Sequence, residues 1–139
     1  MALLRGRESV MQRFRPMLRA HEVTEQQWRV LRAIQAEGAV SASELSRKTL
    51  ISMPSLSRII RSLNDRGLIQ RHSRQDDLRG IELSLSELAE QLMQRVGPES
   101  ERIYQEVASQ FGMEDLNQLY LLLDRLTEVL EDNRSNNGK

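Results

Sequence analysis

The segment from Ser41 to Leu85 constrains the fold of this chain more than any other part of the sequence. Residues 41–44 read SASE, a pattern typical of a capping box at the start of a helix. A second start signal follows at Ser52, with Pro54 in the first turn, where a missing N–H costs little. Two short helices separated by a few residues form a helix-turn-helix, and the segment predicts this motif.

The second helix of this motif is predicted to be amphipathic. Its apolar residues recur at helical spacing and form one stripe: Leu56, Ile59, Ile60 and Leu63. At about 100° per residue the opposite face carries polar and basic residues. These are Pro54, Ser57, Arg58, Arg61 and Asp65. In a helix-turn-helix the second helix enters the major groove of DNA, so this face is the candidate reading surface.

Two short strands are predicted after Gly67, which is expected to end the helix. Residues 68–71 read LIQR, residues 81–85 read IELSL, and the charged segment 72–80 lies between them. This pattern indicates a hairpin. The predicted fold is therefore mainly α with a small β-hairpin wing, a winged helix-turn-helix.

Helices are predicted on both sides of this motif. Residues 3–19 have a helical repeat that Pro16 should kink or split, and Thr24 begins a capping box for a helix that ends at Gly38. From Ser86 a long helix is expected, broken or bent near Gly97-Pro98.

A last helix, from about Glu114, has an apolar surface wider than one face of a small domain needs. Either the same chain covers both sides of this helix, or a second copy covers one of them, which predicts a homodimer. We expect one domain over 1–139, with a DNA-binding lobe at 24–85 and dimerisation helices at 1–20 and 86–132.

The charge distribution agrees with a nucleic-acid partner although the net charge is zero. Residues 41–80 contain eight Lys or Arg and four acidic residues, whereas residues 86–132 contain three Arg and eleven acidic residues. The middle of the chain is therefore locally basic, and the local field steers a polyanion.

Several classes of protein are disfavoured by the sequence. The chain has no cysteine, no apolar run near the roughly 18 residues of a membrane span, and no signal-peptide pattern, so we expect a cytoplasmic protein without a membrane partner. It has no glycine-rich phosphate loop and no nucleophile motif, and His21 and His72 have no partners at metal-ligand spacing. We therefore expect no enzyme activity, no cofactor and no metal.

The sequence resembles the MarR family of bacterial transcription regulators over nearly its whole length. The most specific element is Asp77-x-Arg79 followed by Leu85-Ser86, which is similar to the wing signature of that family, although threonine is more common at the position of Ser86. Residues 14–32 and 98–112 resemble the subgroup of repressors of homoprotocatechuate (4-hydroxyphenylacetate) degradation operons. The resemblance implies a homodimeric repressor of such an operon, relieved by an aromatic acid.

The candidate DNA contacts lie on the second helix and the wing. Arg58 or Arg61 would pair with guanine edges, and Ser55 and Ser57 would reach phosphate or base atoms. Arg79 would enter the minor groove, held by Asp77 as the resemblance implies. The remaining candidates are Ser52 and Pro54 at the helix start, and Arg71 and Arg74, which would contact phosphate. The alternatives are a solvated basic helix face and an exposed Asp77–Arg79 ion pair.

Two copies would place two reading helices about 34–36 Å apart, which predicts a palindromic operator of double-stranded DNA. A small aromatic carboxylate is the effector that the resemblance implies. By the same resemblance its site would involve residues between the DNA-binding lobe and the dimerisation helices: Phe14, Arg15, His21, Trp28 and Arg29. Alternatively, Phe14 and Trp28 belong to the core, and Arg15 or Arg29 braces the dimer. A competing function is a winged-helix adaptor that binds protein and not DNA.

Overall fold

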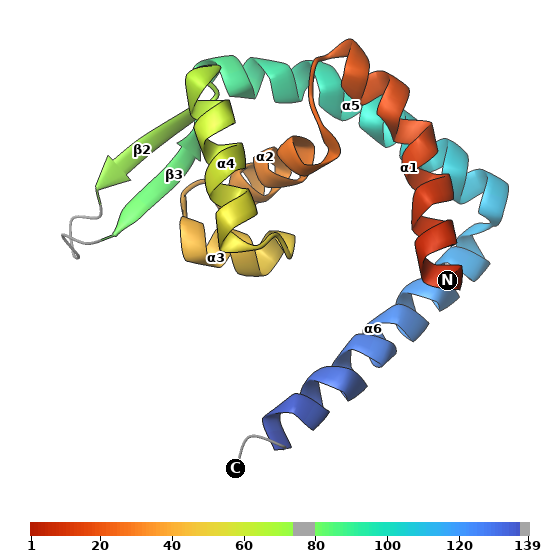
Figure 1. Ribbon diagram of the computed structural model, residues 1–139. Helices are drawn as coiled ribbons and strands as arrows, with labels where there is room; N and C mark the ends of the chain where they lie inside the picture. Colours follow the sequence, from red (N-terminus) through yellow and green to blue (C-terminus); the bar gives the residue numbers. More distant parts are fainter. Residues whose placement is uncertain (74–79, 137–139) are drawn as a thin grey trace. The chain divides into compact units, whose positions relative to one another are not determined.

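The computed structural model describes residues 1–73 and 80–136. Within this range the chain forms six helices and a three-stranded sheet (Figure 1). It divides into two compact units, Met1–Ser100 and Glu101–Lys139, and helix α5 (Glu87–Phe111) runs from the first into the second. The predicted fold class, mainly α with a small β-hairpin wing, is confirmed.

Helix α1 spans Ala2–Ala20 without interruption, so of the kink or split predicted at Pro16, the split is wrong. Proline removes one backbone hydrogen bond, but the residues directly after it, Met17 and Leu18, are 7% and 2% exposed and anchor the last turn in the core.

Helix α2 spans Glu25–Glu37 and has the predicted capping box. The Gln27 N–H donates to Thr24 Oγ1 and the Thr24 N–H donates to Gln27 Oε1, both at 3.1 Å. Gly38 ends this helix with a φ of 78°, a conformation that favours glycine.

Helices α3 (Ala42–Thr49) and α4 (Met53–Asp65) form the predicted helix-turn-helix. Ser41 caps α3, because its Oγ accepts the Glu44 N–H at 3.3 Å. Ser52 occupies the capping position of α4, but its side chain makes no capping hydrogen bond. Gly67 follows α4 with a φ of 70°, which lets the Leu68 N–H return to the Leu63 carbonyl at 2.9 Å.

The sheet has the strand order β1-β3-β2 and is antiparallel. Strands β2 (Ile69–Ser73) and β3 (Ile81–Leu85) form the predicted hairpin, with Arg71 opposite Leu83. Strand β1 (Val40–Ser41) pairs with the other edge of β3 and was not predicted, since two residues have no periodicity to detect.

The core of the first unit lies between α2, the helix-turn-helix and the sheet. Its fully buried side chains include Val30, Leu31, Ile34, Val40, Leu45, Leu56 and Leu63. The start of α5 joins this core through Ser86, whose Oγ donates to the Gly67 carbonyl at 2.6 Å and accepts the Ala89 N–H at 3.1 Å. A hydroxyl at this position therefore ties α5 to the turn that ends α4.

Helix α5 is continuous through Pro98, so of the break or bend predicted near Gly97-Pro98, the break is wrong. Val96 and Ser100, on either side of the proline, are buried and hold the helix in place despite the missing hydrogen bond.

In the second unit, Gly112 has a φ of 101° at the turn that leads into α6 (Met113–Asn136). Large apolar side chains of α6 are exposed in the single chain: Leu119, Leu121, Leu122, Leu126, Val129 and Leu130. Among the described residues, none of the helices combines the length and the apolar character needed to cross a bilayer.

Candidate nucleic-acid interface and effector pocket

The outer face of α4 is basic and exposed. Leu56, Ile60 and Leu63 are buried on its inner face. The opposite face holds exposed side chains that the sequence singled out: Pro54, Ser57, Arg58 and Arg61, with Ser52 before the helix and the half-buried Ser55 at its edge. Neither Arg58 nor Arg61 is hydrogen-bonded to another described residue, so both guanidinium groups have all five N–H donors available.

Strand β2 extends the basic face of α4. Arg71 is exposed on β2, and together with Arg61 and Ser57 it lines an open cavity of about 330 Å³. His72 on the same strand bonds Ser84 of β3, with 2.8 Å between Nε2 and Oγ, and this contact braces the hairpin. The predicted wing contacts Arg74, Asp77 and Arg79 lie outside the described residues.

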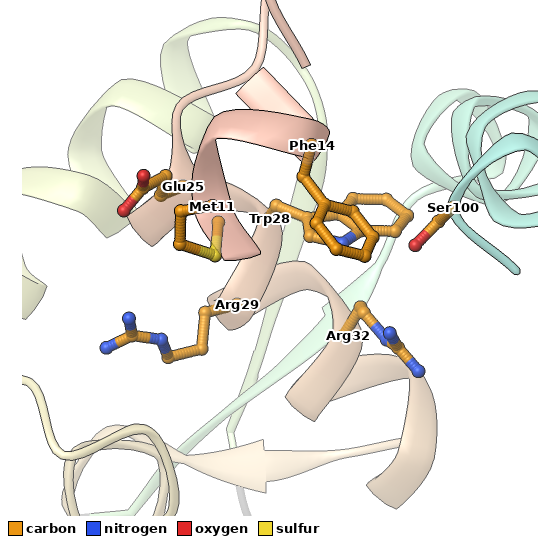
Figure 2. Close-up of a pocket in the computed structure, with 7 residues that line it drawn as sticks. All are labelled: Met11, Phe14, Glu25, Trp28, Arg29, Arg32 and Ser100. Carbon is orange, nitrogen blue, oxygen red and sulfur yellow. The ribbon is translucent and has the colours of Figure 1, made fainter. Parts of the chain in front are cut away.

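A second cavity of about 350 Å³ lies within the first unit and is called the α1–α2 pocket here (Figure 2). Its walls come from α1, α2 and residue 100 of α5. They are formed by Met11, Phe14, Glu25, Trp28, Arg29, Arg32 and Ser100. Apolar and aromatic surface therefore meets two guanidinium groups and one carboxylate, a composition that suits a small aromatic acid.

The two pocket arginines have different partners. In Figure 2 their guanidinium groups point in opposite directions from α2. Arg29 Nη1 donates to the carbonyl of Thr49, the last residue of α3, at 3.3 Å. Arg32 is exposed and lies 6.0 Å from the ring centroid of Trp28, and it forms no ion pair with any residue in 1–73 or 80–136. Arg32 is thus the pocket cation that is available to a ligand carboxylate.

An ion-pair network joins α1 to the start of α2. Arg15 pairs with Glu8 through both terminal nitrogens, and its Nε donates to Glu25 Oε1 at 2.7 Å. Arg7 donates to Glu25 Oε2 at 2.9 Å. The hydrogen bond from Arg15 lowers the pKa of Glu8, and the hydrogen bonds to Glu8 and Glu25 raise the pKa of Arg15.

Glu25 is ionised at neutral pH despite its partial burial. Burial acts to raise the pKa of this carboxyl, but the hydrogen bonds from Arg7 and Arg15 outweigh it, and the pKa is lowered. In the pocket Glu25 therefore presents a carboxylate that can only accept hydrogen bonds.

Comparisons with known proteins show the family of this chain. The model of the MarR family matches residues 21–80. The homoprotocatechuate degradative operon repressor of Escherichia coli is 33% identical over 123 residues, covering 88% of this chain and 83% of that protein. The chain belongs to the MarR family. It is therefore a DNA-binding transcription regulator and not an enzyme, and the resemblance to the homoprotocatechuate repressors is confirmed.

Two further relatives of this MarR-family chain are similar over most of their length. The HTH-type transcriptional regulator FarR of Neisseria gonorrhoeae is 32% identical over 127 residues, which are 91% of this chain and 85% of FarR. The solved structure of NadR in complex with 4-hydroxyphenylacetate is 32% identical, has a TM-score of 0.79, and the match covers 90% of this chain and 89% of NadR.

The sequence predicted part of the pocket of this MarR-family protein. Of the predicted ligand residues, the structure brings Phe14, Trp28 and Arg29 together. Arg15 does not line the pocket and instead holds Glu25, while His21 lies elsewhere, with its Nε2 3.3 Å from Glu99 Oε1.

Sequence reasoning missed four pocket residues: Met11, Glu25, Arg32 and Ser100. Arg32 could have been found, because it is four residues after Trp28 and therefore on the same side of α2. Ser100 could not, since nothing local indicates that this part of α5 faces α1 and α2.

Proposed function

We propose that this MarR-family regulator is a homodimeric repressor of an operon for homoprotocatechuate or 4-hydroxyphenylacetate degradation, and that an aromatic carboxylate releases it from DNA. The observation that carries this proposal is the α1–α2 pocket, where two aromatic rings adjoin the available guanidinium of Arg32. The same unit presents the basic face of α4, so one unit holds both a DNA-reading surface and an effector site.

The DNA contacts are proposed as follows. Arg58 and Arg61 read guanine edges in the major groove, where a bidentate arginine recognises O6 and N7. The helix start, with Ser52 and Pro54, and the serines Ser55 and Ser57 lie against the phosphate backbone. Arg71 and Arg74 neutralise phosphates, and Arg79, held by Asp77, enters the minor groove. The exposure of the α4 face and of Arg71 supports the roles of these residues, and the family resemblance supports those of Asp77 and Arg79.

The ligand is proposed to bind with its ring between Phe14 and Trp28 and its carboxylate on Arg32. Glu25 would accept a hydrogen bond from a ring hydroxyl, because its lowered pKa leaves it ionised. A hydroxylated phenylacetate has both groups. NadR, at 32% identity, has been solved with 4-hydroxyphenylacetate, which supports this class of ligand.

In this proposal Arg29 borders the ligand and Arg15 keeps Glu25 in place. His21 lies outside the pocket lining, next to Glu99, and does not contact the ligand.

The proposed dimer is formed by the apolar residues that the single chain leaves exposed. They occur on α6 and also at the start of α1, where Leu3, Leu4 and Val10 are 63%, 58% and 41% exposed. Exposed apolar side chains on two helices support an interface with a second copy. A palindromic operator follows from such a dimer, since each copy would address one half-site.

A DNA titration tests this function. Labelled duplex from the region upstream of the protein's own gene is titrated at two salt concentrations, with and without 4-hydroxyphenylacetate or homoprotocatechuate. We expect binding that weakens steeply with salt, because phosphate contacts release counterions, and that weakens further with one of the acids. Salt-sensitive binding that no aromatic acid changes would contradict the effector proposal. Absence of binding to any duplex would favour the adaptor alternative.

A further inference from the structure

Gln27 in the first turn of α2 serves two helices at once. Its backbone N–H and its Oε1 complete the capping box with Thr24. The same side chain extends to α4: its Nε2 donates to Ser62 Oγ at 3.2 Å, and its Oε1 also accepts from Arg66 Nη1 at 3.3 Å. The capping box alone needs only an acceptor at this position, so the amide has a second role that glutamate could not fully replace.

Arg66 adds a second link at the same place. It follows directly after α4, and its Nη1 donates to the carbonyl of Glu22 at 2.7 Å. Glu22 lies in the turn between α1 and α2 and has a φ of 57°, a left-handed conformation that is unfavourable for a residue other than glycine. The charge-assisted bond from Arg66 holds this carbonyl, so the end of α4 and the α1–α2 turn fix one another.

These links adjoin the α1–α2 pocket. Gln27 directly precedes Trp28, the aromatic wall, and Arg29 directly follows it. Because Arg29 donates to the Thr49 carbonyl at the end of α3, the two neighbours of Trp28 contact the two helices of the helix-turn-helix. A ligand that displaces Trp28 would therefore also displace Gln27 and Arg29, and through their hydrogen bonds it would shift α4 and α3.

We propose that Gln27 and Arg66 are positioning residues that set the orientation of the reading helix α4 and transmit occupancy of the α1–α2 pocket to it. This inference rests on the proposed function, since it concerns how the ligand weakens DNA binding. Neither residue touches DNA or ligand in this proposal. Both hydrogen bonds of Arg66 to these neighbours, Glu22 and Gln27, use its Nη1.

Salt dependence separates a positioning role from a phosphate contact. If Arg66 bound a phosphate, its loss would reduce the slope of log affinity against log salt by about 1. If Arg66 only positions α4, its loss weakens DNA binding and leaves the slope unchanged. The effect of the ligand on DNA affinity gives the second readout, because coupling between two sites is commonly about 5- to 150-fold.

The experiment compares Arg66→Met with the wild-type protein by fluorescence anisotropy on the upstream duplex, over a series of salt concentrations, with and without 4-hydroxyphenylacetate. We expect DNA binding to be about tenfold weaker, which corresponds to the loss of roughly one hydrogen bond, and we expect the salt slope to be unchanged. We also expect the ligand-induced change in affinity to fall by at least about threefold. Direct ligand binding, followed through Trp28 fluorescence, should stay within about twofold of wild type.

A second variant distinguishes the loss of positioning from a loss of the fold. Gln27→Glu keeps the acceptor that Thr24 and Arg66 need, so the capping box and the stability of α2 should persist. It removes the donor to Ser62. We expect weaker DNA binding and reduced coupling with an unchanged thermal midpoint, and we expect Ser62→Ala to behave in the same way.

The outcomes are distinguishable. If the wild-type protein does not bind the duplex, or if the ligand does not change its DNA affinity, both the proposed function and this inference are overturned. A normal wild-type response that Arg66→Met and Gln27→Glu retain in full, or a reduced salt slope in Arg66→Met, overturns this inference alone.

Discussion

Replacing Arg32 by alanine should weaken binding of 4-hydroxyphenylacetate and leave the fold intact. Arg32 is exposed and has no ion-pair partner within the described chain, so its guanidinium is free to form a forked pair with a carboxylate. A hydrogen bond to a charged group contributes about 1.5–3 kcal/mol, which corresponds to a dissociation constant higher by about 10- to 100-fold. The cost in stability should not exceed about 1 kcal/mol, the scale of an exposed cation–π contact with Trp28.

Trp28 provides the assay, because it is the only tryptophan of the chain and lines the pocket. Its fluorescence is titrated with 4-hydroxyphenylacetate and with the alcohol analogue that lacks the carboxylate. Arg32→Ala should weaken binding of the acid but not of the alcohol. The affinity of Arg32→Lys for the acid should lie between those of the wild type and Arg32→Ala. Arg29→Ala is the comparison, and it should also lower stability because the Thr49 carbonyl loses its donor. Equal losses for acid and alcohol in Arg32→Ala would refute the role given to Arg32.

Four further outcomes are expected. Arg61→Ala should cost about 1–3 kcal/mol of discrimination at one base pair, measured by competition with single-base operator variants; equal loss on all sequences would make it a phosphate contact. Because the pKa of Glu25 is lowered in the folded state, its contribution to stability is present above its ordinary pKa of 4.5 and is lost as the pH falls through the folded value. The difference in the free energy of unfolding between wild type and Glu25→Gln should therefore be constant near neutral pH and shrink below pH 4.5, measured by urea denaturation at each pH; a difference that grows in acid would contradict this. Thr24→Ala removes the cap of α2 and should cost about 1 kcal/mol in the same assay, and no change in the urea midpoint would show that the cap is dispensable. Leu126→Glu places a charge on the exposed apolar face of α6 and should yield monomers in sedimentation velocity; an unchanged dimer would place the interface elsewhere.

The parts of the fold that the sequence predicted are those set by local chemistry. The capping box at Thr24, the stop at Gly38 and the apolar stripe of α4 each depend on residues within one or two turns. The helix breaks expected at the two prolines do not occur, because the cost of a missing hydrogen bond competes with burial of neighbouring side chains. Met17 beside one proline and Val96 beside the other are buried by contacts that no local pattern shows.

The site was predicted unevenly for the same reason. The amphipathic pattern of α4 identified its exposed basic face directly. The pocket depends on which faces of α1, α2 and α5 meet, so Phe14 and Trp28 were predicted only through the family resemblance. Arg15 was expected near a ligand, but the structure pairs it with two carboxylates.

In the proposed function, two copies of α4 read one operator together and the effector releases both. Hydroxyl-radical footprinting of the upstream duplex tests it most directly. We expect two protected half-sites on one side of the duplex, with centres about 34–36 Å apart, that disappear together when 4-hydroxyphenylacetate is added. A single protected half-site, or two that persist at saturating effector, would contradict it.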